Sequence, residues 1–308
     1  MSIVDVLIVG GGPSGLSAAL TLVRQRHTVR VFDIDDCRAS PSPHLHAVTG
    51  CEHELEAYDC FTLNKVEVTN LKAIGEGFEA TDSDGATYTG RKVILANGVV
   101  SRFPQIDGYA DCFGKGIFHN LFAQAYQKDT SKVRCGVLAV DWIAMPQFTY
   151  HLSHLGNQLA ASVTVYTNGS EELAATVKPT FEGKPWKLDT RKIAKLALRA
   201  QDAHDTAVKI TFEDGETVTE DFVGHAPMTI VRGPFAEQLG LKLSAIGGGE
   251  YETRPPFFAT EVKGVYAAGD VVTPFKVWPN ASASGAQAAA GVAVALQEQK
   301  WNLPPLFP

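Results

Sequence analysis

The sequence has few cysteines and lacks the closely spaced pair that dithiol chemistry needs. Its five cysteines among 308 residues are Cys37, Cys51, Cys60, Cys112 and Cys135, and no two are spaced as Cys-x-x-Cys. An odd number at scattered positions does not suit the framework of a disulfide-stabilised secreted domain. We therefore expect most of these thiols to be buried and inert.

The sequence also lacks a long apolar run and a strong excess of one charge. No run is long enough to span a bilayer, and a net charge of −7 argues against nucleic acid or an anionic membrane as a partner. The first predicted strand begins at residue 4, which leaves no room for a signal peptide, and the last residues carry no retention or peroxisomal signal. These absences predict a cytosolic protein. Its 45% hydrophobic and 20% charged residues are typical of a globular chain, here long enough for two domains.

Glycine is plentiful, and its most informative cluster lies near the start of the chain. The hydrophobic strand 4–9 leads into Gly10-Gly11-Gly12-Pro13-Ser14-Gly15 and then into an Ala- and Leu-rich helix. This pattern is typical of the turn that seats a dinucleotide pyrophosphate: Gly10 lets the chain turn, Gly12 lets the backbone approach the phosphates, and Gly15 lets helix and strand pack closely. A second strand, 28–33, ends in Asp33, about 20 residues further on, where a ribose-binding carboxylate belongs. The alternative is a chance glycine turn in an α/β protein.

Two similar hairpins indicate that the nucleotide fold occurs twice. Segments 78–88 and 208–218 each carry an Asp-Gly turn, and each is followed by a hydrophobic strand, at 92–96 and 221–225. Between them, a strand at 133–140, a helix from about 147 to 161 and a strand at 162–166 predict a second βαβ unit.

The second unit lacks its glycine turn. After its first strand the chain reads Val140-Asp141-Trp142-Ile143-Ala144-Met145-Pro146, and Trp142 would obstruct the close approach of a pyrophosphate. After its second strand, segment 167–172 holds no arginine cluster for a 2′-phosphate. We interpret this domain as one that kept the architecture and lost the nicotinamide site; the alternative is an atypical loop that still binds NAD(P)H.

A third nucleotide signal lies near the C-terminus. The strand 264–270 closes on Gly269-Asp270, where the glycine permits close backbone approach and the carboxylate can bond a ribityl hydroxyl. The small-residue helix at 281–290 follows, and its N-terminus is suited to stabilise charge on a reduced isoalloxazine ring.

With these motifs the chain resembles the FAD-dependent thioredoxin-reductase-like proteins, and in particular the fungal dithiol oxidases of the gliotoxin type. Further similar segments are 90–96, 116–119, 165–169 and 233–235. The resemblance implies an α/β homodimer whose subunit has two Rossmann-like, three-layer domains of the FAD/NAD-linked reductase type. It places a discontinuous FAD-binding domain at 1–106 and 231–308, with a degenerate NAD(P)-binding-like domain inserted at 107–230. The residues assigned to FAD are Gly10, Gly12, Pro13, Ser14, Gly15, Asp33, Arg38, His46, Val68, Ala96, Asn97, Gly98, Gly269, Asp270, Val277 and Trp278.

The chain departs from this family at the redox disulfide. In the family a Cys-x-x-Cys pair follows the residue that matches His119, whereas here Asn120 and Ala123 stand at the two cysteine positions. Neither an amide nor a methyl group can act as the thiolate of disulfide exchange. A distant pair, such as Cys112 with Cys135, has no support in the spacing.

His119 and Asn120 are the candidate catalytic residues, because the resemblance puts them near the flavin. His119 is suited to remove a proton as hydride leaves, and Asn120 to orient a substrate carbonyl or hydroxyl. The alternative for both is a local structural role. His44 and His46 alternate along one extended segment, but no third metal ligand is evident, so we predict no metal site. Trp278 either walls the pocket or is a buried aromatic, and His151 and His154 belong to a solvated helix face.

The leading hypothesis is an FAD-dependent oxidase or dehydrogenase acting on a small organic substrate of secondary metabolism. Hydride would pass to the flavin and then to O₂, without a redox disulfide or NADPH. Two alternatives remain open: a redox-neutral isomerase or cyclase that contains FAD, and a non-catalytic pseudo-oxidoreductase that binds a partner.

Overall fold

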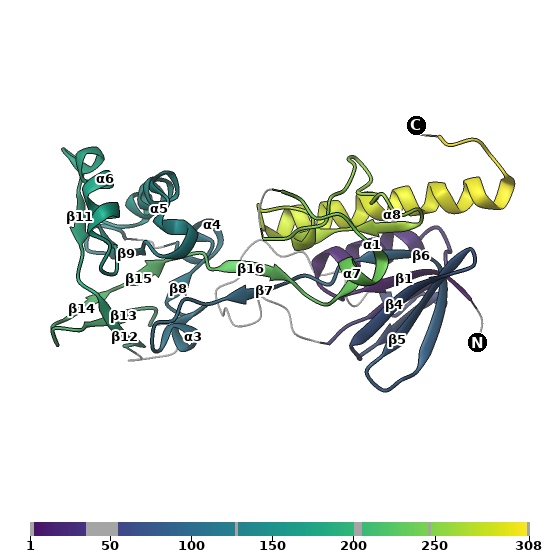
Figure 1. Ribbon diagram of the computed structural model, residues 1–308, viewed down its shortest axis with the longest axis horizontal. Helices are drawn as coiled ribbons and strands as arrows, with labels where there is room; N and C mark the ends of the chain where they lie inside the picture. Colours follow the sequence, from purple (N-terminus) through teal and green to yellow (C-terminus); the bar gives the residue numbers. More distant parts are fainter. Residues whose placement is uncertain (1–2, 35–54, 127–128, 200–204, 246–247, 307–308) are drawn as a thin grey trace. The chain divides into compact units, whose positions relative to one another are not determined.

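The computed structural model describes residues 3–34, 55–126, 129–199, 205–245 and 248–306. The chain forms two compact units (Figure 1). The described residues of the first unit lie within 3–100 and 229–306, and those of the second within 101–228. None of the helices in these described ranges has the length and apolar character needed to cross a membrane. The domain limits of the sequence analysis, 1–106 with 231–308 and 107–230, stay a prediction.

The first unit is built around one mainly parallel sheet. Its elements are β1 (Val4–Val9), α1 (Pro13–Val23), β2 (Val29–Phe32), β3 (Phe61–Asn64), β4 (Val68–Ile74), β5 (Gly77–Asp82), β6 (Thr87–Leu95), α7 (Phe235–Leu239), β17 (Val265–Ala267), η2 (Gly269–Val271) and α8 (Trp278–Trp301). The sheet order is β3-β2-β1-β6-β5-β4, with β17 also paired to β6. Strands β1, β2, β3, β17 and the second half of β6 are parallel, whereas β4, β5 and the first half of β6 form an antiparallel meander.

Alternation along β1 divides the core of this unit between the two faces of the sheet. Val6 and Ile8 pack with α1 and α8, which lie side by side (Figure 1). Leu7 and Val9 point to the other face, where they pack with residues of the β4–β5 hairpin and with the segment around Tyr251. A strand that is buried on both faces must be apolar throughout, which explains the run Val-Leu-Ile-Val before the glycines.

The second unit repeats the plan. Its elements are α3 (Tyr109–Cys112), β8 (Ile117–Phe118), α4 (Leu121–Gln124), β9 (Arg134–Leu138), η1 (Asp141–Ala144), α5 (Pro146–Leu159), β10 (Ser162–Tyr166), α6 (Glu171–Phe181), β11 (Trp186–Asp189), β12 (Ile193–Leu198), β13 (Val208–Phe212), β14 (Thr217–Glu220) and β15 (Phe222–Gly224). A parallel sheet of order β11-β10-β9-β15-β8 lies between helices α5 and α6 on one face and the antiparallel sheet β12-β13-β14 on the other. The chain passes between the units within β7 (Val99–Arg102) and within β16 (Met228–Val231), which pair with each other.

Four parallel strands therefore follow the same order in both units, β3-β2-β1-β6 in the first and β11-β10-β9-β15 in the second. The fifth position is filled by the last strand of the first unit, β17, and by the first strand of the second unit, β8. The predicted α/β architecture is confirmed, and so are the βαβ unit of the second domain and both hairpins. Gly85 and Gly215 of the Asp-Gly turns have φ of 83° and 85°, a region that glycine enters without steric cost. The last helix, α8, extends to Trp301 and is therefore longer than the small-residue helix predicted at 281–290.

Candidate functional site

Backbone atoms of the protein pack closely against one side of the glycine turn after β1. Gly10 has φ of 107°, and a Cβ placed on it would lie 2.1 Å from the Ala96 carbonyl oxygen. A Cβ on Gly15 would lie 1.9 Å from the Gly10 carbonyl oxygen. Both glycines are thus required by close packing at the start of α1, as their spacing predicts.

The other side of the turn is open. A Cβ on Gly12 would have no described protein atom within 4 Å, although its φ of −70° suits any residue. Gly12 is also the N-cap of α1, where no described side chain caps the first-turn amides and no acidic residue lies in the first turn. A helix start of this kind favours an anion. No contact among the described residues explains the glycine here, whereas a phosphate against the backbone does.

Asp33, one residue beyond β2, is held beside this turn. Its carboxylate Oδ1 accepts a hydrogen bond from the Gly11 amide at 3.1 Å, and a Cβ on Gly11 would lie 2.6 Å from the Asp33 Cγ. The motif spacing alone predicts no role for Gly11, because its need for glycine depends on a side chain that is distant in sequence. The contact orients Asp33 at the position where a ribose is expected.

The loop after β6 brings Asn97 to the same edge of the sheet. The Asn97 amide nitrogen donates to the Arg232 carbonyl and to the Tyr251 hydroxyl, the latter at 3.2 Å. Its Oδ1 is buried and has no hydrogen-bond partner among the described residues. Burial raises the pKa of Tyr251 to about 12, so the hydroxyl stays protonated. A buried acceptor without a partner is costly and indicates a missing donor, such as a ligand.

The third motif meets the first at the N-termini of α1 and α8. Gly269 has φ of 83°, and a Cβ there would lie 2.5 Å from the Ser14 hydroxyl oxygen. Its amide donates to Ser284 at 2.9 Å, and a Cβ on Gly285 of α8 would lie 2.1 Å from the Ser14 carbonyl oxygen. Asp270 follows, half-buried. Four segments that are far apart in sequence thus converge on one edge of the first sheet.

The other residues predicted to contact FAD lie at the following positions. Pro13 is the first residue of α1, Gly98 has φ of 66°, and Val68 is buried in the core at the start of β4. Val277 is the N-cap of α8, and the Trp278 indole nitrogen is buried with no partner among the described residues. Arg38, His44, His46, Cys37 and Cys51 lie outside the described residues.

The corresponding turn of the second unit is filled. After β9 the chain forms the short helix η1, and the Trp142 indole nitrogen donates to the Ala226 carbonyl oxygen at 2.6 Å. The Trp142 ring packs edge-on against Phe148, with ring centroids 4.6 Å apart. Asp141, with φ of 50°, stands where a glycine would be needed.

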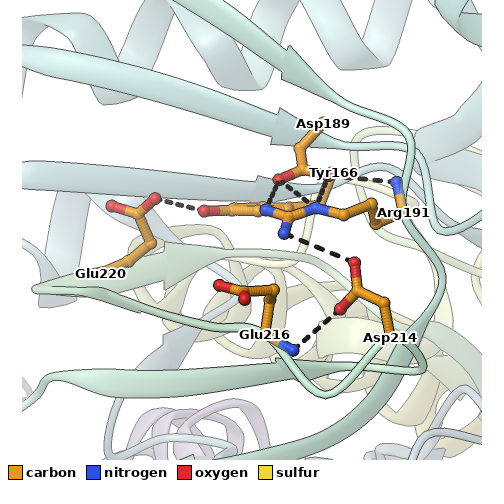
Figure 2. Close-up of polar contacts among 6 residues, drawn as sticks. All are labelled: Tyr166, Asp189, Arg191, Asp214, Glu216 and Glu220. Atoms are coloured by element: carbon orange, nitrogen blue, oxygen red, sulfur yellow. Dashed lines mark hydrogen bonds and ion pairs between the residues drawn. The ribbon is translucent and has the colours of Figure 1, made fainter.

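The positive charge of Arg191, which follows the edge strand β11 of this unit, is already paired with carboxylates of the protein (Figure 2). Arg191, two residues beyond β11, forms a two-pronged pair with Asp189, at 3.0 and 2.6 Å, and lies 3.7 Å from Asp214. The Tyr166 hydroxyl donates to the buried Glu220, whose pKa is raised by burial. The one arginine at this edge among the described residues is therefore bound to carboxylates of the protein.

His119 and Asn120 follow β8 in the second unit. Asn120 caps α4, since its Oδ1 accepts the Phe122 amide at 3.1 Å, and the His119 ring stacks on Phe113 at 5.6 Å. Strand β15 pairs with β8 so that His225 and His119 lie at neighbouring strand ends, and the His225 amide donates to the Phe118 carbonyl. His225 was not among the predicted site residues, because nothing in the sequence shows that β15 pairs with β8.

His225 is fully buried and held by Tyr109. The Tyr109 hydroxyl and the His225 Nδ1 are 2.6 Å apart, and burial lowers the pKa of His225 to about 3. Burial likewise raises the pKa of Tyr109. Both rings are therefore neutral near neutral pH, and their contact links the end of β15 to the start of α3.

The geometry of the first unit defines a class of protein, one that holds a dinucleotide at the carboxyl edge of a parallel sheet and whose last helix begins at the same place. Comparison with known proteins makes this specific. The family model for pyridine nucleotide-disulphide oxidoreductases matches residues 4–285. The chain belongs to this family and is an FAD-dependent oxidoreductase.

The relatives cover nearly the whole chain. It is 40% identical to a protein named thioredoxin reductase aclD from Aspergillus oryzae, over 94% of this chain and 95% of that one. It is 35% identical to thioredoxin reductase sirT from Leptosphaeria maculans, over 94% of each. Among solved structures, an oxidoreductase from Agrobacterium tumefaciens superposes with a TM-score of 0.84 at 25% identity, over 97% of this chain and 99% of that one.

FAD fits the first unit on the evidence of the protein's own atoms. The open space at Gly12, the uncapped α1 and the unpartnered Asn97 Oδ1 lie on adjoining segments. The residues that would hold the cofactor are Asp33 at a ribose, Gly12 to Gly15 at the pyrophosphate and the α8 N-terminus at the isoalloxazine ring. FAD supplies hydride-accepting chemistry when bound, and the protein supplies position and electrostatics.

Proposed function

We propose that this oxidoreductase takes hydride from a small organic substrate, in secondary metabolism, and passes electrons from FAD to O₂ without a redox disulfide or NADPH. The observation that carries the proposal is the segment after β8. Asn120 and Ala123 occupy the positions where the related dithiol oxidases have cysteines, and Asn120 uses its side chain to cap α4. A thiol-based electron relay has no thiol there.

Two of the three described cysteines support this proposal, the third being the half-buried Cys60. Cys112 and Cys135 are fully buried, and burial raises the pKa of Cys112 to about 11 and raises that of Cys135 further. Thiols in this state carry almost no thiolate at neutral pH, and the thiolate is the reactive form. Trp142 and the paired Arg191 support the absence of a nicotinamide step, because they fill and neutralise the corresponding edge of the second unit.

Within this proposal, His119 is the base that accepts the substrate proton and Asn120 orients the substrate. The support is the family resemblance of the segment together with its position at the end of a parallel strand, where ligands of α/β folds bind. Assembly as a homodimer stays a prediction. The protein's own part is to hold substrate and FAD in line and to exclude water.

The test is anaerobic reduction of the purified holoenzyme. A true substrate should bleach the flavin absorbance under nitrogen, and air should restore it with release of H₂O₂; NADPH and a gliotoxin-type dithiol should do neither at a comparable rate. His119→Gln should slow bleaching by roughly 10²- to 10⁴-fold, while His151→Gln, exposed on α5, should not change it. Conversion of a substrate to a product of equal mass, with no bleaching, would instead identify redox-neutral catalysis. Rapid bleaching by NADPH would contradict the proposal.

A further inference from the structure

A buried ion pair lies at the start of α8. The Lys276 Nζ is 2.5 Å from Glu250 Oε1 and 2.8 Å from the Thr273 carbonyl oxygen, and the two side chains are 9% and 2% exposed. In each other ion pair recorded among the described residues, at least one side chain is more than a quarter exposed; Lys72–Glu79 is typical, at 54% and 24%. Burying two charges costs desolvation energy and is weak evidence for stability. The pair therefore needs another explanation.

The pair connects the segments that form the cofactor edge of the first unit. Glu250 precedes Tyr251, whose hydroxyl bonds Asn97 and whose amide donates to the Val271 carbonyl at 2.7 Å. Lys276 precedes Val277, the N-cap of α8. The ion pair thus ties the segment before β17, which reaches the loop after β6 through Tyr251 and Asn97, to the residues just before α8.

The start of α8 contacts the helix that follows the glycine turn, and several polar groups near it have no hydrogen-bond partner among the described residues. The Ser17 hydroxyl of α1 donates to the Ser282 carbonyl of α8 at 2.8 Å. Among the described side chains none caps α8, and its first turn holds no acidic residue. Glu250 Oε2 and the Trp278 Nε1 are buried and have no partner among the described residues. The positive helix end and the Lys276 ammonium both favour negative charge nearby, while the Glu250 carboxylate opposes it.

We propose that Lys276 and Glu250 are positioning residues that set the charge at the α8 N-terminus and thereby the reduction potential of the bound FAD. Uptake of two electrons and one proton leaves one negative charge on the flavin ring system. Lys276 and the helix end stabilise that charge, and Glu250 limits the stabilisation. This role applies to any two-electron donor or acceptor, so it stands independently of the oxidase proposal above.

The test is the reduction potential of FAD-loaded variants, measured against a reference dye during slow enzymatic reduction. Glu250→Gln removes the counter-charge and should raise the ratio of reduced to oxidised FAD at fixed potential about tenfold, or about 30 mV for a two-electron couple. Lys276→Met should lower the ratio by a similar factor. Lys276→Arg should restore it to within about threefold of the wild type, a change of about 0.7 kcal/mol.

Two control variants separate the effect of charge on the reduction potential from a loss of folding or of FAD binding. Lys72→Met breaks the exposed pair with Glu79 and should leave the potential unchanged. If a single variant fails to retain FAD, the double variant E250Q/K276M, neutral like the native pair, should retain it with a ratio near that of the wild type. Shifts in the same direction for E250Q and K276M, or shifts below threefold for both, would overturn the proposal. Because no substrate or O₂ is used, this result is distinguishable from a failure of the oxidase proposal.

Discussion

The turns after β1 and β9 occupy equivalent places in two sheets that share the order of four parallel strands, and they show how one fold keeps or loses a nucleotide site. Both lead to helices that begin with proline and have no side-chain cap, at Pro13 and Pro146. In the first unit, glycine backbone fits against the loop after β6 and leaves space at Gly12. In the second, Trp142 occupies the same relation to the loop after β15, with its indole on the Ala226 carbonyl.

The comparison teaches that the scaffold does not depend on the glycine turn. The second unit preserves parallel strands, helix positions and a two-sided core without it. An indole that donates one hydrogen bond and packs on Phe148 stabilises the same junction. The glycines of the first unit leave space for a ligand after β1, whereas Trp142 of the second unit fills the equivalent space after β9.

The largest expected effect comes from adding a methyl group to the close side of the first turn. Gly15→Ala places its Cβ 1.9 Å from the Gly10 carbonyl oxygen, so the helix must move, and we expect a loss of about 3 kcal/mol in the free energy of unfolding. Urea unfolding of the FAD-free protein measures it. Gly12→Ala is the matched control: its methyl meets no described atom, so stability should fall only by the roughly 1 kcal/mol that alanine costs at an N-cap, while FAD affinity falls at least about tenfold. Equal stability losses in the two variants would break the comparison.

A smaller effect concerns the residue after the fourth strand of each sheet, Ala96 in the first unit and His225 in the second. The pKa of His225 is about 3 in the folded protein, below its unfolded value of about 6.5. Between these values the unfolded chain binds the extra proton, so stability is present above about pH 6.5 and is lost as the pH falls.

From pH 7 to pH 5, this histidine should account for about 2 kcal/mol of lost unfolding free energy. Urea unfolding at both pH values, with FAD saturating, measures the loss in the wild type and in His225→Gln, which should lack this part of it. His151→Gln, at an exposed position on α5, should keep the wild-type dependence. An unchanged pH dependence in His225→Gln would show that His225 titrates normally.

The smallest effect, that of Trp142→Phe, tests the hydrogen bond of the filled junction, and Trp142→Ala is its larger reference. Trp142→Phe keeps an aromatic ring beside Phe148 and removes the hydrogen bond to Ala226, so we expect a loss of about 1 kcal/mol in unfolding free energy. Trp142→Ala should lose about 3 kcal/mol, because the ring is removed as well. Fluorescence-detected unfolding measures both. If Trp142→Phe were as damaging as Trp142→Ala, the hydrogen bond would be the main support of the turn.

Local pattern predicted much of this molecule. The apolar run before Gly10, the two Asp-Gly hairpins and the βαβ segment from 133 to 166 were recognisable because period, turn residues and length agree. The glycine roles at positions 10 and 15 followed from the same pattern, and the structure confirms them. The domain limits, the assignments of His119 and Asn120 and the dimer rest on resemblance and stay predictions.

The residues that sequence reasoning missed owe their importance to partners far along the chain. Gly11 meets Asp33, Glu250 meets Lys276, and Tyr109 meets His225, a separation of 116 residues. No local periodicity records such a meeting. Their burial and lost hydration, which change charge and pKa, arise only once the sheets have formed.

The sequence by itself determined that this chain has two nucleotide folds, one with a glycine turn and one without, and that no Cys-x-x-Cys pair serves them. Those properties follow from residue type and short spacing. The tertiary structure decided which polar atoms remain without partners at the cofactor edge, that Trp142 bonds Ala226, and that a buried ion pair stands at the start of α8. A side chain loses its water and finds its hydrogen-bond partners only when strands pair and helices pack, and these contacts join segments that are distant in sequence.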